Sequence, residues 1–425
     1  MVEKRRSGCK PRTYHALLTC AAPRGRSPVG GTGPVGLERW QSGRMHLLGK
    51  QAYSQGYREF ESPPLRWNAW TRDRAAKRPW MIVDAHAHLI APPALYAYRS
   101  MLIVSGAQHG SGLAGIPDEE LRKSADGNVA LMDEVGTDIQ FISPRPFMQI
   151  NRGRASDARL WARSNNELIA RTIAFHPARF RGVAALPQVA GASIESVFDE
   201  IDYAVERLGF IGVLLNPDPG EGVEQTPTLA DPYWFPLYEK LIAMRLPAHI
   251  HSGGCCGRET YDEHFITEES LAITSLARSD VFDRYPELDL LISHGGGSIP
   301  YQIGRWRSNR ELQRAHGLSS SGFAFRGASA APKRSESFDQ TLKHFWFDTC
   351  LHNRKSLELL FDVVGTDRCV FGTERPGSGS GVDPETGRQY DDIKPTIESI
   401  GGLTAEQKHD IFEGNARRLF PRFRP

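Results

Sequence analysis

The chain has 425 residues, 40% of them hydrophobic and 24% charged, which is ordinary usage for a globular protein with a sizeable core. No run approaches the ~18 consecutive apolar residues that a membrane-spanning helix needs, so we expect a soluble protein. The net charge of +2 gives no reason to expect a nucleic-acid partner.

Charge is distributed unevenly along the chain. Residues 1–80 hold 16 Lys or Arg against 5 Asp or Glu, whereas the remainder holds 36 basic against 45 acidic residues. The first segment mixes Arg, Gly, Pro and Ser without a sustained apolar period, which predicts a disordered basic extension. Because Met81 stands directly before an apolar run, a mis-called start is the alternative. We therefore expect the folded domain to span residues 81–425.

The cysteines show no CxxC pair and no regular spacing, which favours a reducing compartment over a disulfide framework. They are Cys9, Cys20, Cys255, Cys256, Cys350 and Cys369. The cytoplasm is the expected location. Cys255 and Cys256 are adjacent, and we expect them to be small buried or loop residues, since a reactive or ligand cysteine needs an electropositive setting.

From residue 81 onward, short apolar or β-branched runs alternate with amphipathic stretches, the pattern of repeated βα units. The predicted strands are MIVDAHAHL at 81, DIQFISP at 138, FRGVAALP at 180, GFIGVLLNP at 209, LPAHIHSG at 246, LDLLISHGG at 288, HFWFDTC at 344 and RCVFGTERP at 368. Eight parallel strands close into an α/β fold, the (β/α)8 TIM barrel, whose ~250 residues fit within this chain.

An open, doubly wound sheet is the alternative architecture. It is disfavoured because no GxGxxG or GxxxxGK[ST] motif follows the first predicted strand. Between the first two strands lies segment 91–136, which contains Gly and Ser at 105–115. Its length predicts a mobile loop over the mouth of the barrel.

The first predicted strand carries two histidines in the sequence DAHAH. Strand alternation places His86 and His88 on one face, with roughly 6.5 to 7 Å between their α-carbons, near enough for both imidazoles to reach one cation. Taken alone, such a pair is more often a packed or surface group than a metal site.

Further ligand types stand late in other predicted strands. They are His249 and His251 in the fifth strand, His294 in the sixth and Glu374 in the eighth. Because barrel active sites lie at the carboxyl ends of the strands, we expect these side chains to converge. Three histidines and a carboxylate suit Zn²⁺ or a similar divalent ion. Spacing does not choose between His249 and His251, and we favour His251 because it lies nearer the strand end.

The segments that carry these residues resemble one enzyme family over nearly the whole of 81–425. MIVDAHAHL, DIQFISPRPFM, LLNPDPGEG, HIHSG, LLISHGGGSIPYQIGRWR, FDTC and FGTE are similar to the amidohydrolase superfamily, in its amidohydrolase-related, decarboxylase-like branch. Much of that branch has Asp at the end of the eighth strand. Glu374 in GTERP resembles instead the 4-oxalomesaconate hydratases of the branch.

The resemblance implies the metal ligands and the residue that faces them. One divalent metal, Zn²⁺ or else Mn²⁺, would be bound by His86, His88, His251 and Glu374. His294 would face this metal as an acid or a water-orienting group.

The resemblance also implies that Arg145 and Asn216 hold substrate carboxylates. A surface position for Arg145 and a turn-forming role for Asn216 are the alternatives. The chain departs from the hydratase pattern at Arg375 and Pro376, and at Phe265, where a Tyr is expected. We expect these three positions to line the mouth of the barrel.

The implied activity is that of a metal-dependent lyase of aromatic-acid catabolism, which adds water to an unsaturated oxo-polycarboxylate. The metal and an arginine would stabilise enolate-like charge, while Glu374 or His294 moves protons. A carboxy-lyase acting on an aromatic or enoic acid, and an amidohydrolase-type hydrolase, are the alternatives at the same metal.

A function of a different class would be nucleic-acid binding through the basic residues 1–80. Composition is its only support, because the body of the chain offers no basic recognition helix. We therefore expect a small carboxylate substrate and neither nucleic acid nor membrane as a partner. The sequence leaves homo-oligomerisation open.

Overall fold

The computed structural model describes residues 79–105, 112–316 and 336–425. The predicted disordered extension, residues 1–80, lies outside the described residues except for Pro79 and Trp80. In the described ranges no helix has both the length and the apolar character that crossing a membrane requires.

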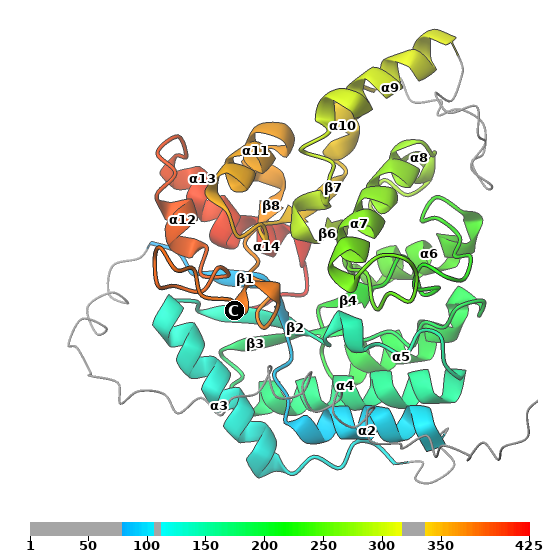
Figure 1. Ribbon diagram of the computed structural model, residues 1–425, viewed down its shortest axis with the longest axis vertical. Helices are drawn as coiled ribbons and strands as arrows, with labels where there is room; N and C mark the ends of the chain where they lie inside the picture. Colours follow the sequence, from blue (N-terminus) through cyan, green and yellow to red (C-terminus); the bar gives the residue numbers. More distant parts are fainter. Residues whose placement is uncertain (1–78, 106–111, 317–335) are drawn as a thin grey trace, which may run out of the picture. The chain divides into compact units, whose positions relative to one another are not determined.

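Eight parallel strands follow one another in sequence order around a single sheet (Figure 1). They are β1 (Val83–His88), β2 (Ile139–Ser143), β3 (Phe180–Ala184), β4 (Gly212–Leu215), β5 (Ala248–Ile250), β6 (Leu290–Ile292), β7 (Phe345–Asp348) and β8 (Cys369–Val370). The sheet closes where β1 meets the segment after β8, since Ala85 N donates to Phe371 O and His88 N donates to Arg375 O, both at 2.8 Å. The predicted (β/α)8 barrel is confirmed, with a strand inside each of the eight predicted runs.

Helices surround the strands (Figure 1). The α-helices are α2 (Pro93–Ser105), α3 (Asp118–Val135), α4 (Ala155–Phe175), α5 (Phe198–Asp202), α6 (Phe235–Met244), α7 (Tyr261–Ala277), α8 (Val281–Arg284), α9 (Ile303–His316), α10 (Phe338–Leu342), α11 (Arg354–Val364), α12 (Lys394–Glu398), α13 (Ala405–His409) and α14 (Asn415–Leu419). The short helices of other types are η1 (Pro146–Met148), η2 (Ile194–Val197), η3 (Tyr203–Arg207), η4 (Pro232–Trp234), η5 (His294–Gly296), η6 (Thr366–Arg368), η7 (Ser378–Ser380) and η8 (Asp410–Gly414).

The segment between β1 and β2 differs from the sequence-based expectation. It forms α2 and α3, so the prediction of a long loop over residues 91–136 is wrong. α3 buries Leu121, Ala125 and Met132 on one face, and it ends at Gly136, whose φ of 78° suits the left-handed region. The length of the segment, on which the expectation rested, is taken up by these two helices rather than by a loop. Residues 106–111 lie outside the described residues.

The end of the barrel at which the strands begin is closed by the C-terminal segment of the chain. Phe420 and Phe423 each lie edge-on to Phe141, with ring centroids 4.9 Å apart. Phe420 also packs on the first residue of β4, because a Cβ added to Gly212 would lie 3.0 Å from its ring. Apolar side chains therefore fill this end, and polar chemistry is left to the opposite one.

An irregularity in β1 decides which of its side chains meet at that opposite end. The pairing of β1 with β2 shifts register between Asp84 and Ala87. Strict alternation would put Asp84 on the same face as His86 and His88. Asp84 instead accepts a hydrogen bond from Gln140 Nε2 at 3.0 Å. The carboxylate of Asp84 therefore meets Gln140, and its contact with His86 is with the backbone N, at 3.3 Å.

Candidate metal centre

Three buried histidines face one another at the carboxyl ends of β1 and β5. They are His86, His88 and His251, whose ligand atoms all lie within 4.8 Å of one another. The Nε2 atom of each is buried and has no hydrogen-bond partner. Buried polar atoms without partners are rare because they are costly, and three that converge on one point fit a shared metal ion.

The other ring nitrogen of each histidine is held by the protein. His86 Nδ1 contacts Asp348 Oδ2 at 2.6 Å, His88 Nδ1 contacts Ser143 Oγ at 2.9 Å, and His251 Nδ1 contacts the Ser252 carbonyl at 2.8 Å. When Nδ1–H donates to such an acceptor, the lone pair lies on Nε2 and points into the centre. This tautomer and orientation are typical of metal-binding histidines.

The structure separates the two histidines of the fifth predicted strand. His251 follows the end of β5, and its Nε2 points toward His86 and His88. His249 lies within β5, where its Nε2 contacts Ser293 Oγ at 2.8 Å and stands 3.8 Å from Asp348 Oδ2. His251 thus keeps a nitrogen available to a ligand, whereas His249 supports the carboxylate that holds His86.

Burial sets the charge of these groups. It lowers the pKa of His88 and of His251 well below the usual value, with neighbouring histidines adding to the effect. Burial would raise the pKa of Asp348, but hydrogen bonds from His249 and His86 hold it well below its usual range. His88 and His251 therefore present neutral imidazoles, the form that binds a metal, and Asp348 is an ionised carboxylate.

Glu374 and His294 stand on the adjoining side of the centre. Their ligand atoms and that of His251 lie within 4.8 Å of one another, and His294 Nε2 is 3.4 Å from Glu374 Oε1. The second nitrogen of His294, Nδ1, contacts Oε1 of the buried Glu269 at 2.8 Å. His251 is therefore common to the group of three histidines and to the group that contains Glu374.

The pKa values of this pair are shifted in opposite directions. Burial would lower the pKa of His294, but the charges of Glu269 and Glu374 raise it well above the usual value. Burial would raise the pKa of Glu374, but the charge of His294 holds it well below the usual range. An imidazolium thus faces a carboxylate at short distance, an arrangement that can deliver one proton and accept another.

Both residues adopt backbone conformations that are uncommon for residues with a side chain. The φ angle is 48° at His294 and 61° at Glu374. Such conformations persist where the surroundings hold them and are frequent at active sites. The run of Gly residues at 295–297 also has positive φ, and a Cβ on Gly297 would lie 2.5 Å from the Ile266 carbonyl. This run permits a tight turn and close packing beside His294.

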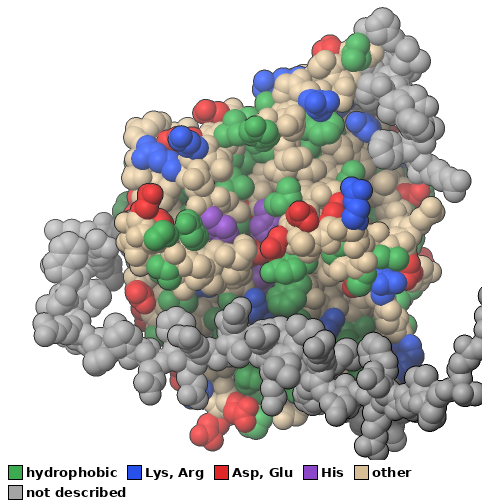
Figure 2. All heavy atoms as spheres, in the orientation of Figure 1, with side chains coloured by type: hydrophobic (Ala, Val, Ile, Leu, Met, Phe, Trp, Pro, Cys, Tyr) green, Lys and Arg blue, Asp and Glu red, His purple; other side chains and the backbone are tan. Residues whose placement is uncertain are grey.

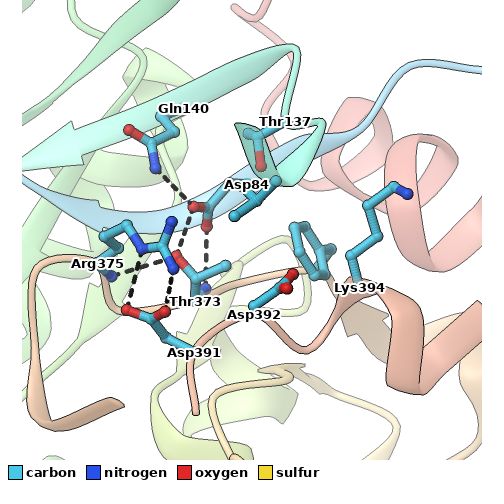
Figure 3. A pocket seen from close by; sticks show the side chains of 10 residues that line it. Asp84, Thr137, Gln140, Thr373, Arg375, Asp391, Asp392 and Lys394 are labelled. Atoms are coloured by element: carbon cyan, nitrogen blue, oxygen red, sulfur yellow. Dashed lines mark hydrogen bonds and ion pairs between the residues drawn. The ribbon is translucent and has the colours of Figure 1, made fainter. Parts of the chain in front are cut away.

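The residues on either side of Glu374 are anchored in a small pocket next to β1 (Figure 3). Thr373 donates from N and from Oγ1 to the carboxylate of Asp84, at 3.0 and 2.7 Å. Arg375 is 4% exposed, and its guanidinium forms an ion pair with Asp391. The expectation that Arg375 lines the mouth of the barrel is therefore wrong, because this side chain is used to fix the backbone that carries Glu374.

Phe265 forms one wall of the centre. Its ring is parallel to that of His294 at 5.9 Å and edge-on to that of His251 at 4.9 Å. An apolar ring at this position supplies shape and excludes water, but it offers no proton.

On the face drawn in Figure 2, histidine side chains lie near the middle with acidic side chains beside them.

Arg145 follows β2 and is half-buried. Its charge lowers the pKa of His88, although burial is the largest cause of that shift. The guanidinium carbon lies 4.9 Å from the centre of the Phe147 ring, and Nε is buried without a hydrogen-bond partner. Arg145 therefore has donor capacity that the described part of the chain does not use.

Asn216 follows β4 and lines a small cavity together with His251, Asn151 and Gln188. Its Nδ2 donates to Asn151 Oδ1 at 3.1 Å, and its Oδ1 accepts from the backbone N of Asp218 at 2.9 Å. The structure therefore brings Asn216 close to the metal centre while its amide also shapes the turn.

Sequence reasoning missed three side chains at the centre: Asp348, Glu269 and His352. His352 has a φ of 49°, both its ring nitrogens are buried without a hydrogen-bond partner, and its Nε2 is 3.9 Å from Glu374 Oε2. An Asp at the end of a barrel strand is a signal in itself, so Asp348 could have been found. Glu269 and His352 could not, because no spacing in the sequence relates them to His294 or Glu374.

Comparison with known proteins assigns the chain to a family. The amidohydrolase family model matches residues 83–422. The 2-keto-4-carboxy-3-hexenedioate hydratase of Sphingobium sp. is 34% identical over 349 residues, which cover 80% of this chain and 96% of that protein. The crystal structure of 4-oxalomesaconate hydratase from Rhodopseudomonas palustris matches with a TM-score of 0.68 and 33% identity, over 80% of this chain and 96% of that one.

A more distant relative catalyses a different reaction. The 2-amino-3-carboxymuconate-6-semialdehyde decarboxylase of Dictyostelium discoideum is 26% identical, and the match covers 68% of this chain and 75% of that protein. The family therefore includes both hydratases and decarboxylases among the relatives of this chain. On the extent of the family match and on the hydratase identity, this chain belongs to the amidohydrolase family of enzymes.

Proposed function

We propose that this enzyme is a metal-dependent lyase that adds water across the double bond of an unsaturated oxo-polycarboxylate. The observation that carries the proposal is the convergence of three buried Nε2 atoms without partners, those of His86, His88 and His251, beside Glu374. The similarity to two hydratases selects hydration among the reactions that such a centre can support.

We assign His86, His88, His251 and Glu374 as the metal ligands. Three imidazoles and one carboxylate favour Zn²⁺, with Mn²⁺ as the alternative. A bound ion of this kind lowers the pKa of water toward ~7 and polarises a carbonyl oxygen.

Glu374 and His294 would move the protons of the reaction. As the water oxygen bonds to one alkene carbon, its proton passes to the Glu374 carboxylate, and the His294 imidazolium gives a proton to the neighbouring carbon. Proton transfer from Glu374 back to His294, whose facing atoms are 3.4 Å apart, then restores both groups. Glu269, hydrogen-bonded to His294 Nδ1, favours the protonated form of that imidazole.

Arg145 and Asn216 would hold the substrate carboxylates. Arg145 has an unused buried donor close to His88, and its planar fork suits a carboxylate. The Asn216 amide would exchange its contact with Asn151 for one with the substrate. Holding the substrate in this way aligns the double bond with the proton-transfer pair.

A carboxy-lyase reaction is the second candidate, because a decarboxylase is among the relatives of the chain. Cytoplasmic location is also proposed, since Cys255, Cys256, Cys350 and Cys369 are free thiols, as expected in a reducing compartment. The partner implied by both candidates is a small carboxylate.

The test is an assay of the metal-loaded full chain with 2-keto-4-carboxy-3-hexenedioate in H₂¹⁸O. Hydration predicts loss of the conjugated alkene and a product with a new hydroxyl group that carries ¹⁸O, a position that does not exchange with water as the keto oxygen does. Chelation of the metal should abolish this reaction. Release of CO₂ from this substrate or from an aromatic acid, with no new ¹⁸O-labelled hydroxyl group, would replace hydration by the carboxy-lyase reaction.

A further inference from the structure

A second group of ligand-type side chains lies outside the centre described above, in the loop between β5 and α7 and in the first turn of α7. Cys255 Sγ, a carboxylate oxygen of Glu259 and one ring nitrogen of His264 lie within 4.8 Å of one another. His264 is 1% exposed, and Cys255 is partly exposed. The proposed hydration uses none of these groups.

The two nitrogens of His264 have different surroundings. Nε2 lies 3.2 Å from Oδ2 of Asp218, in the loop after β4, and Nδ1 lies 3.0 Å from Oε2 of Glu259. Asp218 is itself fixed, because its Oδ2 accepts from Gly222 N at 2.6 Å. Nδ1 of His264 thus already contacts one member of the group, while the buried Nε2 has no hydrogen-bond partner in the described part of the chain although it lies near Asp218.

The surroundings of His264 are acidic. Burial would lower the pKa of His264, but the neighbouring carboxylates of Asp218 and Glu259 raise it to about 9. Burial, and then the charge of Asp218, raise the pKa of the nearby Glu268 to about 7. Asp218 and Glu259 thus place two carboxylates against the His264 ring. A divalent cation bound there would offset their charge.

We propose that Cys255, Glu259 and His264 form a second metal site, which takes Zn²⁺ or a similar thiophilic divalent ion. Thiolate, imidazole and carboxylate are the donor types that Zn²⁺ prefers, and binding would release the protons of Cys255 and His264. The Cys255 thiol donates to the backbone carbonyl of Glu259 at 3.2 Å, so the sulfur lies next to the residue whose carboxylate would be another ligand. The inference does not rest on the proposed hydration.

An ion at this site would fix the start of α7. The helix begins at Tyr261 and carries His264, and the residues that contact His294 follow on the same helix, one immediately after His264 and one five residues after it. Those residues are Phe265, which stacks on the His294 ring, and Glu269, which binds its Nδ1. The second site is therefore placed to stabilise the wall of the catalytic centre without taking part in the reaction.

Co²⁺ titration of the metal-free full chain provides the test, because a thiolate bound to Co²⁺ gives a charge-transfer absorption that imidazole and carboxylate ligands do not give. We expect the wild type to show this band. Cys255→Ser should lose the band together with an equivalent of bound Co²⁺, and Glu259→Gln should weaken the binding that produces the band. Co²⁺ retained by Cys255→Ser at the catalytic centre would show that this variant is folded.

Two other cysteines serve as matched controls. The Cys256 thiol donates to Glu221 Oε2 at 3.1 Å, and Cys350 Sγ is 3.3 Å from His86 Nδ1, in the catalytic centre. Cys256→Ser and Cys350→Ser should both keep the band. A wild type without the band, or a band that survives Cys255→Ser, would overturn the second site. The band arises only from thiolate bound to Co²⁺, whereas the proposed catalytic ligands are histidines and a glutamate. The band should therefore be unchanged if the proposed hydration is wrong.

Discussion

The two ends of the barrel differ in what they leave unsatisfied. Where the strands begin, Phe141, Phe420 and Phe423 pack edge to face in a closed apolar cluster. Where the strands end, buried nitrogens such as His86 Nε2 and His251 Nε2 have no hydrogen-bond partner. Apolar packing at the first end stabilises the folded state. The second end leaves nitrogen atoms free to bind a metal, at a cost in stability. Substitutions where the strands begin should therefore change the free energy of unfolding, and substitutions where the strands end should change metal binding and turnover.

The largest effect is expected from His86→Ala combined with His88→Ala. Removal of two Nε2 donors leaves too few ligands for the metal, so both metal content and turnover should fall to background. Metal analysis of the purified protein measures the first and the hydration assay the second. His409→Ala, on the surface, is the control. A double variant that keeps its metal and its activity would show that the ligand assignment is wrong.

Glu374→Gln should slow the metal-saturated enzyme by roughly the 10²- to 10⁴-fold that is typical of a lost general base. The amide can still offer an oxygen to the metal but cannot accept a proton. Turnover is measured at increasing metal concentration. If excess metal restores the wild-type rate, Glu374 is only a ligand, and the base must be sought at His294.

Phe420→Ala tests the opposite end of the barrel. Truncation of this buried ring should lower the free energy of unfolding by about 3–5 kcal/mol, because it removes apolar contacts and leaves a cavity beside Phe141. Urea denaturation measures this loss. Below the unfolding transition, the metal content and the turnover of the variant should match those of the wild type. A reduced turnover in the folded variant would show that the two ends are coupled.

Asp348→Asn should weaken metal binding by about 10- to 100-fold, since in the proposed assignment the carboxylate orients His86 and is not a ligand. Competition with a chelator of known affinity measures the change. Ser143→Ala, which removes the weaker partner of His88, should have a smaller effect. Unchanged affinity in Asp348→Asn would show that His86 is held by other contacts.

The smallest effect is expected from removal of residues 1–80. The segment lacks a packing pattern in its sequence, so a chain that starts at Met81 should keep its metal, its turnover and its unfolding temperature. A large loss in any of these would show that the segment packs on the folded domain.

Much of this architecture could be predicted from the sequence because it repeats locally. Each strand appears as a short apolar run, and the histidines at 86 and 88 obey the period of a strand. The shift in β1 pairing between Asp84 and Ala87 could not be predicted, since it depends on how two strands align. The same holds for Glu269 and His352, which reach the centre from a helix and a loop through tertiary packing.

The choice between His249 and His251 has a similar origin. Both obey strand alternation, so the pattern favours neither. What distinguishes them is a contact across the barrel, because Ser293 occupies Nε2 of His249 and nothing described occupies Nε2 of His251. The same kind of contact explains Arg375, which was expected to line the mouth of the barrel because the chain departs there from the hydratase pattern, and which instead forms a buried ion pair with Asp391.

Anomalous X-ray diffraction from crystals of the Zn²⁺-loaded protein tests the central claim most directly. We predict a metal peak at ~2.0–2.1 Å from Nε2 of His86, His88 and His251, and at ~2.0–2.2 Å from a carboxylate oxygen of Glu374. A metal peak that is bonded to His249 and Asp348, and that lies too far from His251 Nε2 for a bond, would contradict the account.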